Sequence, residues 1–339
     1  MTDVNVAILG LGRLGASFGL ALKRYMTGKD AAHRFTITGY DERAYNAKTA
    51  KARGAVDATV NAPHAAAARA HIVLITAPYR QVETLYRAIG PDLAPGAVVL
   101  DASPLKKPSA RWAGETLPQQ AEVAAYLVGI TPVLNPDALL VSAPDLEDPD
   151  HARADLFDRG ALMIVPAAGC PAEAVELAAE FARIVGATAH FMDPDEHDAL
   201  IAATEGLPAL LGLALFRALS TAGAWGDLRR LSNPAFGLAT HHLRHFQSGD
   251  LWALLHHNRT HTARYLDTLI KTLETLRAAL EKDTEGVELE AALDQAAAKY
   301  EEWEKQRFTN QWEKEPEVNV PVTGIFGSLT GGLIGRRKK

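Results

Sequence analysis

The sequence predicts an α/β fold in which a doubly wound, mainly parallel sheet is followed by an all-helical domain. The first observation is a glycine-rich turn between an apolar run and an amphipathic helix within residues 4–22. The second is a series of short, continuous apolar runs up to residue 191, which is the pattern of strands covered by helices on both faces. The third is that only helical periodicity follows residue 193.

The glycine turn reads Gly-Leu-Gly-Arg-Leu-Gly at residues 10–15. Gly10 would make the tight turn after the strand, Gly12 would let the backbone approach a pyrophosphate, and Gly15 would let the helix pack closely on the sheet. Arg13 and Leu14 begin the helix, whose unpaired N–H groups and dipole favour an anion. These features predict a Rossmann-type dinucleotide site. The alternative is a nucleotide-free domain of the same fold with an ordinary glycine turn.

The second predicted strand, residues 35–41, ends in an acid that favours NAD as the cofactor. Asp41 would accept hydrogen bonds from the adenosine ribose, and its charge would repel a 2′-phosphate. NADP stays open as an alternative, because Arg13 and Arg43 could bind that phosphate. Ala77 and Pro78, at the end of the next apolar run, complete the predicted cofactor-binding set.

The remaining strands and the domain limits follow from the same patterns. We expect strands at residues 71–78, 97–101, 125–130, 161–165 and 187–191, and hence an NAD(P)-binding domain over residues 1–193. Asp193 reads as the cap of a helix with acids in its first turn. A helical dimerisation and substrate domain is expected over residues 194–307, and a flexible, Gly-rich tail over residues 308–339.

Two long helices with narrow apolar seams are predicted near the end of the helical domain. Leucines recur at three-four spacing from residue 266 to 280, and the rhythm repeats from residue 289 to Trp303, with Asp283-Thr-Glu-Gly286 between the two. We expect a hairpin that forms a homodimer. The alternative is that both seams are covered within one chain.

Composition limits the partners. The 35 basic and 41 acidic residues give a net charge of −6, which argues against a nucleic-acid partner. The single cysteine excludes an intrachain disulfide. No basic-then-apolar leader precedes the first strand, so we expect no signal peptide and a cytoplasmic location. The tail has glycines at four-residue spacing and a basic end. These features allow an alternative to a free tail, in which the tail contacts a membrane surface.

Several motifs outside the glycine turn resemble those of the prephenate/arogenate dehydrogenase family. The family pattern Asp-x-Gly-Ser-x-Lys appears as Asp101-Ala-Ser-Pro-Leu-Lys106, and Gly-x-His-Pro-Met appears as Gly129-Ile-Thr-Pro-Val133. His-Asp followed by Ser-His-Leu-Pro-His appears as His197-Asp198 and then Glu205-Gly-Leu-Pro-Ala209. Leu-Trp-x₅-Asn appears as residues 251–258. The resemblance implies a Rossmann domain joined to an all-helical dimerisation domain, and an NAD-dependent role in tyrosine biosynthesis.

The chain departs from the family at its reactive positions. The family histidine that assists deprotonation of the substrate hydroxyl is replaced by Thr131, which cannot take up a proton near neutral pH. The family serine aligns with Pro104, although Ser103 is next to it. Gly206 and Ala209 replace both histidines of the helix motif.

Other residues are candidates for the missing chemistry. Lys106 would polarise a carbonyl or hold a carboxylate, Ser103 and Thr131 would bind the substrate hydroxyl, and Glu205 would act as a base with a raised pKa. His241 takes the place of the family's substrate-binding arginine. His241 and His245, or His257 and His261, lie at metal-binding spacing, but no acid accompanies them, so we expect no metal site.

These observations favour an NAD-dependent oxidoreductase that acts on a small hydroxy acid other than prephenate itself. A catalytically inactive, NAD-binding regulatory or scaffold protein is the alternative from another class. A third interpretation keeps the fold but uses a different reduced cofactor, such as a deazaflavin.

Overall fold

The computed structural model describes residues 1–120, 124–138, 148–244, 247–282 and 286–312, and its centre is one eight-stranded sheet. The strand order is β3-β2-β1-β4-β5-β6-β7-β8, and every neighbouring pair is parallel except β6 and β7. The predicted α/β fold with a mainly parallel sheet is thus confirmed. The strands are β1 (Thr2–Leu9), β2 (His33–Tyr40), β3 (Ala58–Thr59), β4 (Ile72–Ile75), β5 (Val98–Asp101), β6 (Tyr126–Val133), β7 (Ala161–Pro166) and β8 (Thr188–Phe191).

Helices cover both faces of the sheet, which explains why its inner strands are continuously apolar. Alternate residues of β1 enter different cores: Val6 packs with the side of α1 and α6, and Leu9 with the side of α3, α4 and α5. The helices of this part are α1 (Arg13–Met26), α2 (Ala44–Ala52), α3 (Pro63–Ala67), α4 (Val82–Ile89), α5 (Lys106–Thr116) and α6 (Ala172–Val185), with short 3₁₀ turns η1 (Tyr79–Gln81), η2 (Gly90–Asp92), η3 (Pro136–Ala138) and η4 (Pro149–His151). The two-residue strand β3 is too short to leave a sequence signal.

The chain becomes entirely helical after β8, within the described residues. The elements are α7 (Pro194–Ile201), the π turn η5 (Ala202–Gly206), α8 (Leu207–Ser220), α9 (Trp225–Leu228), α10 (Pro234–Thr240), the 3₁₀ turn η6 (His241–Arg244), α11 (Ser248–His257), α12 (Arg259–Lys282) and α13 (Val287–Thr309). Asp193 caps α7 as predicted, because its carboxylate accepts from the N–H groups of Asp195 at 2.8 Å and Glu196 at 3.3 Å.

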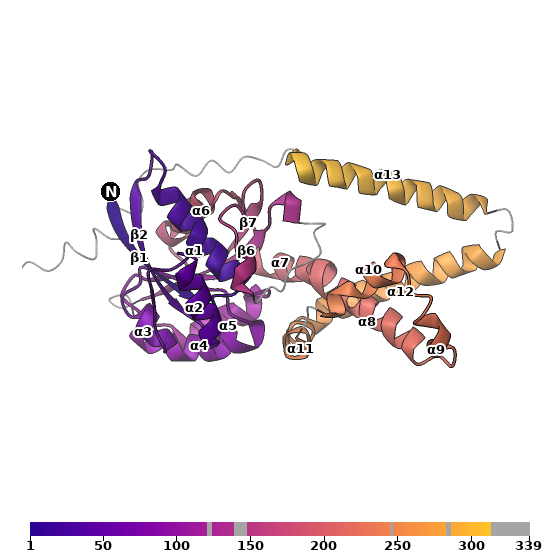
Figure 1. Cartoon of the computed structure of the whole chain (residues 1–339), viewed down its shortest axis with the longest axis horizontal. Helices are drawn as coiled ribbons and strands as arrows, with labels where there is room; N and C mark the ends of the chain where they lie inside the picture. Colours follow the sequence, from indigo (N-terminus) through magenta and orange to yellow (C-terminus); the bar gives the residue numbers. More distant parts are fainter. Residues whose placement is uncertain (121–123, 139–147, 245–246, 283–285, 313–339) are drawn as a thin grey trace, which may run out of the picture.

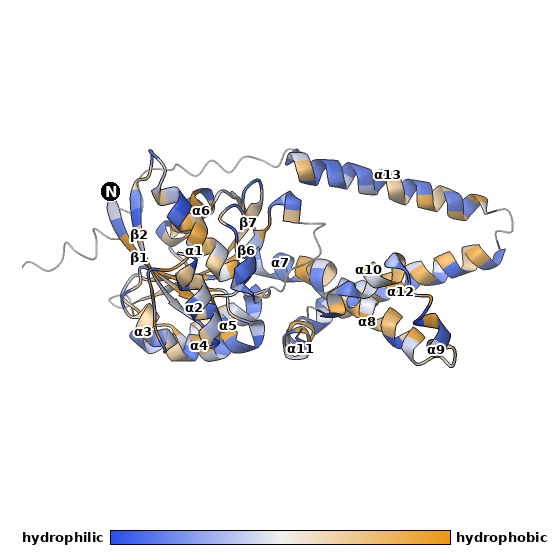
Figure 2. Ribbon diagram, in the orientation of Figure 1, coloured by the Kyte–Doolittle hydropathy of each residue, from blue (hydrophilic) through white to orange (hydrophobic). Residues whose placement is uncertain are grey.

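The helices α8 to α12 form an arm that extends away from the sheet, and α13 returns along it (Figure 1). The end of α13 touches the sheet domain, where the Arg307 guanidinium donates to the Leu134 carbonyl. Much of the predicted apolar seam is uncovered: Leu280 of α12 is 67% exposed and Leu293 of α13 is 62% exposed. Figure 2 shows the apolar residues of α8 and α12 as orange segments along the arm.

Two further expectations concern the C-terminal tail and contact with a membrane. Most of the predicted tail, residues 313–339, lies outside the described residues. Among the described helices, the run Pro194–Ser220 is long and apolar enough to span a bilayer by length and composition, with 28% of its most apolar window buried. A long apolar helix of this kind is weak evidence for a membrane, because helices of soluble proteins have the same composition.

Candidate nucleotide and substrate site

The glycine turn joins β1 to α1 with no room for side chains at two of its three glycines. Gly10 has φ +101°, and a Cβ there would overlap the backbone of Ala77. A Cβ on Gly15 would overlap the Gly10 carbonyl oxygen and lie 2.5 Å from Thr76 Oγ1. Gly12 occupies the N-cap of α1 with extended backbone. The two glycines therefore let the turn and the first turn of α1 pack directly against the chain that follows β4, and they set the N-terminus of α1, the end of a helix that favours an anion, at the edge of the sheet.

The first residue of α1 supplies a buried cation at this turn. Arg13 is 7% exposed, and its Nε has no hydrogen-bond partner among the described residues. Burial first, and then the charge of Arg153, lower the pKa of Arg13. An anion placed between these guanidinium groups would offset both effects, so the residues fit a pyrophosphate. The next residue, Leu14, is half-buried and packs against the core of the sheet.

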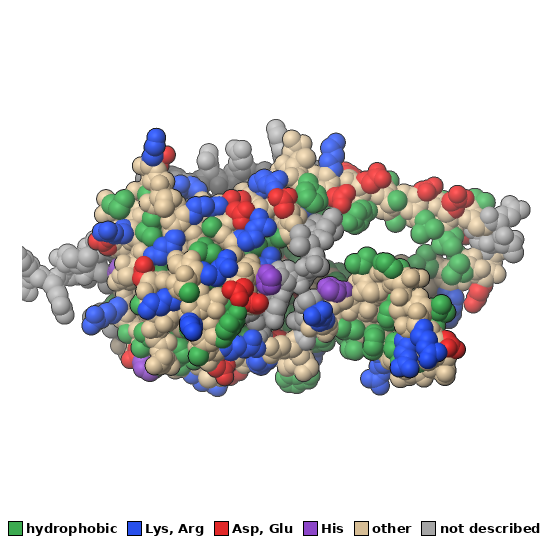
Figure 3. All heavy atoms as spheres, viewed as in Figure 1, with side chains coloured by type: hydrophobic (Ala, Val, Ile, Leu, Met, Phe, Trp, Pro, Cys, Tyr) green, Lys and Arg blue, Asp and Glu red, His purple; other side chains and the backbone are tan. Residues whose placement is uncertain are grey.

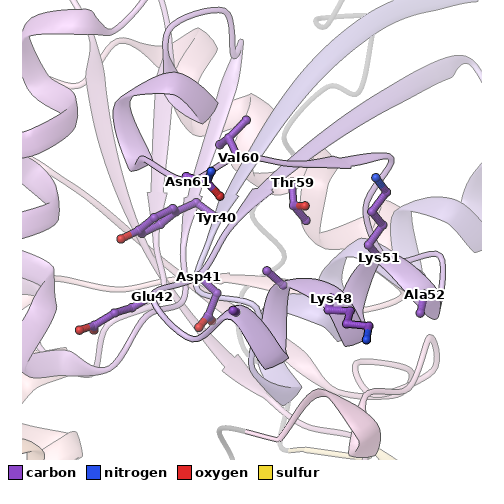
Figure 4. A pocket seen from close by; sticks show the side chains of 11 residues that line it. Tyr40, Asp41, Glu42, Lys48, Lys51, Ala52, Thr59, Val60 and Asn61 are labelled. Carbon is purple, nitrogen blue, oxygen red and sulfur yellow. The ribbon is translucent and has the colours of Figure 1, made fainter.

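Asp41 stands at the end of β2, next to the turn. Its carboxylate accepts from the Leu11 N–H at 2.6 Å and from the Arg43 N–H at 2.8 Å, and it borders a cavity of about 570 Å³. The cavity is lined by Tyr40, Asp41, Glu42, Ala44, Ala47, Lys48, Lys51, Ala52, Thr59, Val60 and Asn61. Figure 4 shows the acids at one end and the lysines of α2 at the other. Arg43 itself is exposed and is not part of this lining.

Lys106 begins α5, shortly after the carboxyl end of β5, but its ammonium group contacts protein. Nζ donates to the carbonyls of Asp101 at 3.1 Å, Ile130 at 2.7 Å and Ser103, and the residue is 2% exposed. Gly129 makes room for the aliphatic stem, since a Cβ there would be 2.7 Å from Lys106 Cδ. Burial lowers the pKa of Lys106 to about 8. All three ammonium hydrogens have acceptors, so the group is not free to polarise a substrate carbonyl.

Ser103 is likewise engaged within the protein. Its Oγ lies 2.8 Å from Ser109 Oγ, and its N–H donates to the Asp101 carboxylate at 2.7 Å. The side chain is buried at the start of α5, next to the partly exposed Pro104. In this conformation the predicted one-residue replacement of the family serine is directed into α5.

The structure brings Thr131 together with two residues that are 66 and 67 positions later in the chain. Thr131 Oγ1 lies 2.8 Å from His197 Nε2, and His197 Nδ1 lies 3.0 Å from the Asp198 carboxylate. Thr131 is half-buried, whereas His197 and Asp198 are buried. Burial is the largest effect on the His197 imidazole and lowers its pKa.

Asp198 also joins the sheet domain to the helical arm. Its two carboxylate oxygens accept from the N–H groups of Lys106 at 2.8 Å and Lys107 at 3.0 Å, which caps α5 from another element. Its own carbonyl accepts from the amide of Asn258 at 2.6 Å, so the Asn258 of the Leu-Trp element fixes the start of the arm. The sheet domain, through Lys106 and Lys107, and the arm, through Asn258, therefore both hold Asp198 and with it the adjacent His197.

Glu205 and His241 lie elsewhere in the arm. Glu205 is in the π turn η5, and the surrounding protein raises the pKa of its carboxyl, although the side chain itself is exposed. His241 begins η6, which packs against α8 and α10. Within the described ranges, no hydrogen bond joins either residue to Thr131 or Lys106. Their predicted roles as base and substrate contact remain predictions.

The other histidines of the dense group make separate contacts. His256 stacks on Trp252 with ring centroids 4.6 Å apart, His257 meets Tyr79 and Trp112 edge-on, and His261 lies 3.4 Å from Asp195. His245 is outside the described residues. In the part of the chain that the structure describes, no group of three histidine, cysteine or acidic residues could hold a metal.

Comparison with known proteins identifies the family. The model of the prephenate dehydrogenase nucleotide-binding domain matches residues 18–191, just over half of the chain. The chain belongs to the prephenate dehydrogenase family. A cyclohexadienyl dehydrogenase of Zymomonas mobilis is 24% identical over 216 residues, which are 64% of this chain and 67% of that protein.

Solved structures of the family share the fold over most of the chain. Prephenate dehydrogenase of A. aeolicus, solved with hydroxyphenyl propionate and NAD+, has a TM-score of 0.74 at 19% identity and covers 89% of this chain and 99% of its own. Synechocystis arogenate dehydrogenase has a TM-score of 0.67 at 18% identity and covers 88% and 99%. The neighbours thus support both the sheet domain and the helical arm as prephenate dehydrogenase architecture.

His197 is the residue to which sequence reasoning assigned no chemistry. In the sequence it stands out only as half of the His-Asp motif. Its place in the sequence does not predict the contact with Thr131, because β8 runs parallel to β7 and opposite to β1–β6, so a residue that follows β8 is not expected at the carboxyl edge of those strands.

Proposed function

We propose that this protein is an NAD-dependent oxidoreductase that removes a hydride from the carbinol carbon of a small hydroxy acid. The observation that carries the proposal is the turn at Gly10 and Gly15 beside the carboxylate of Asp41, which bounds an open cavity. The family membership and the NAD+ in the related A. aeolicus structure support the choice of cofactor. Asp41 and Glu42 favour NAD over NADP, although Lys48 and Lys51 border the same cavity.

The chain's own residues would hold each part of the dinucleotide. The free N–H groups of α1 and the Arg13 guanidinium bind the pyrophosphate, and Asp41 accepts from the ribose hydroxyls. Ala77, packed against Gly10, and Pro78 border the nicotinamide half. When bound, the nicotinamide accepts the hydride. The sheet edge beside Thr131 then holds the carbon that loses it.

The substrate is proposed to differ from prephenate. Thr131, Gly206, Ala209 and His241 replace the family's reactive or anion-binding side chains, and an imidazole does not reproduce a bidentate guanidinium. Glu205 and His241 are proposed to line the substrate side of the arm. Prephenate and arogenate are nevertheless the first compounds to test.

We further propose a homodimer through the helical arm. Large apolar side chains remain exposed on α8, α12 and α13: Leu211, Leu213, Phe216, Ile270, Leu273, Leu276, Leu280, Val287, Leu293, Tyr300 and Trp303. Figure 3 shows such side chains in green on both α13 and the arm below it. A second copy would cover them. Burial in a dimer core would also account for the apolar run Pro194–Ser220 without a membrane, in line with the cytoplasmic location that we propose.

A substrate panel tests the function. Purified full-length protein is incubated with NAD or NADP and with prephenate, arogenate and other small hydroxy acids, while reduced cofactor is measured. We expect turnover of at least one compound, with NAD preferred. Tight NAD(H) binding without turnover of any compound would instead favour the inactive regulatory or scaffold protein. Failure to bind NAD at micromolar concentration would reopen the choice of a different cofactor.

A further inference from the structure

We propose that Thr131, His197 and Asp198 form a proton relay that replaces the missing family histidine. The inference rests on the proposed function, because it assigns the proton acceptor of that reaction. Thr131 touches the substrate hydroxyl, and His197, behind it, is the final acceptor. Asp198 is a positioning residue.

The donors and acceptors of the three side chains determine the direction in which a proton can move along the relay. The Asp198 carboxylate only accepts, and it already receives two backbone N–H groups of α5. His197 Nδ1 therefore carries the hydrogen that points at Asp198, 3.0 Å away. In a neutral imidazole this leaves Nε2 as an acceptor, so the Thr131 hydroxyl donates to it across 2.8 Å. The lone pairs of Thr131 Oγ1 remain available to accept a hydrogen bond from a substrate.

Burial places the three groups in the order that a relay needs. Thr131 is half-buried near the end of β6, beside the end of β5, whereas His197 is 2% exposed and Asp198 3% exposed. Substrates of open parallel sheets bind at this carboxyl edge. A substrate there can meet the hydroxyl of Thr131, while the imidazole lies too deep for direct contact. The Thr131 hydroxyl thus connects the substrate hydroxyl to the buried His197 imidazole.

Burial, more than the surrounding charges, favours the neutral form of the His197 imidazole. Burial lowers the pKa of the imidazole, Asp198 on the same helix raises it, and Lys106 from α5 lowers it. Asp195, also on α7, is paired with Lys107 of α5 and His261 of α12. Thr131 from β6 is uncharged. Neutral His197 is then ready to take a proton near pH 7.

The step balances with the cofactor of the proposed function. As the hydride leaves the carbinol carbon for the oxidised nicotinamide, the substrate O–H bond breaks and its proton moves to Thr131 Oγ1. The hydrogen of Thr131 moves at the same time to His197 Nε2. The products are a carbonyl compound, the reduced cofactor and an imidazolium that Asp198 stabilises.

Three substitutions test the relay in the full-length protein, with the best substrate of the panel. Thr131→Val keeps the shape and removes the hydroxyl, Thr131→Ser restores it, and His197→Asn keeps a polar group that cannot take up a proton. We expect kcat to fall about 100-fold or more in T131V and H197N, as loss of general base catalysis does, and only a few-fold in T131S. The Kd for NAD should not change. Thr268→Val, at an exposed position of α12 where the hydroxyl bonds only within its own helix, is the matched control for T131V.

The pH profile separates a relay from a structural role. Wild-type kcat/KM should fall on the acid side at a pKa below the ordinary histidine value, and this limb should disappear in H197N. An unchanged profile in H197N, or wild-type kcat in T131V, would overturn the relay while leaving the proposed function intact. A wild-type protein that binds NAD but oxidises nothing in the panel would overturn both.

Discussion

At the scale of residues, the glycine turn is the position where one added carbon has the largest expected effect. In Gly15→Ala the new Cβ would overlap the Gly10 carbonyl, so α1 must shift away from the turn. We expect a loss of about 1–3 kcal/mol in stability and a marked loss of NAD affinity. Thermal unfolding and isothermal titration measure the two effects.

A glycine in an open place provides the control for that substitution. Gly114 is exposed in α5, and a Cβ there would meet nothing within 4 Å. Gly114→Ala should stabilise the protein by up to about 1 kcal/mol and leave NAD binding unchanged. Equal effects of the two alanines would contradict the steric account of the turn.

The carboxylate of Asp41 is expected to set cofactor preference. Asp41→Asn keeps an oxygen that can accept from the Leu11 N–H but removes the charge. The ratio of NADP to NAD affinity should rise at least several-fold, because repulsion of the 2′-phosphate is lost. Glu83→Gln on α4, outside the cavity lining, changes the net charge equally and should leave the ratio unaltered. An unchanged ratio in D41N would exclude Asp41 as the determinant.

The buried ammonium of Lys106 predicts a pH-dependent stability. Its pKa is about 8 in the folded protein and near 10.5 when unfolded, so the unfolded chain binds more protons between these values. Its contribution to stability must therefore rise with pH across that window. The unfolding free energy of the wild type minus that of Lys106→Met should increase by on the order of 1–3 kcal/mol from pH 7.5 to 10, measured by unfolding in urea. A constant difference would show that the ammonium is not buried.

At the scale of elements, Asn258 ties the arm to α7. Its buried amide donates to the Asp198 carbonyl at 2.6 Å. Asn258→Ala should cost about 1–3 kcal/mol by leaving that carbonyl unsatisfied, and it should lower kcat by disturbing His197. Asn5→Ala removes an exposed amide-to-carbonyl bond to Arg69 and should have little effect on either quantity. A stable, fully active N258A would show that the arm is oriented by other contacts.

The elements themselves were largely predictable, and the site was only partly so. Apolar runs and the Asp193 cap predicted seven of the eight strands and the start of the arm, because local pattern decides them. The pairing of Thr131 with His197 depends on how α7 packs against α5 and β7, which no local pattern encodes. The inward direction of Lys106 and Ser103 depends in the same way on the turn into α5 and on the space left by Gly129.

At the scale of the whole molecule, the uncovered arm is expected to be an interface. Leu273 of α12 is 49% exposed within the apolar seam. Leu273→Glu should weaken or abolish the dimer, because a charge would be buried without a partner. Sedimentation velocity measures the change, and Lys271→Glu on the same helix is the control. A wild-type monomer at micromolar concentration would contradict the proposed dimer.

The central claim is that a working dinucleotide site and the Thr131 relay face the same point of the sheet edge. A crystal structure of the protein with NAD and a non-reactive substrate analogue tests this most directly. We predict the pyrophosphate at the turn of Gly10 to Gly15, and the carbinol oxygen of the analogue within hydrogen-bond distance of Thr131 Oγ1. The carbon that gives the hydride should lie about 3–3.5 Å from the nicotinamide C4. A nicotinamide remote from Thr131, or an analogue held without contact to its hydroxyl, would contradict the account.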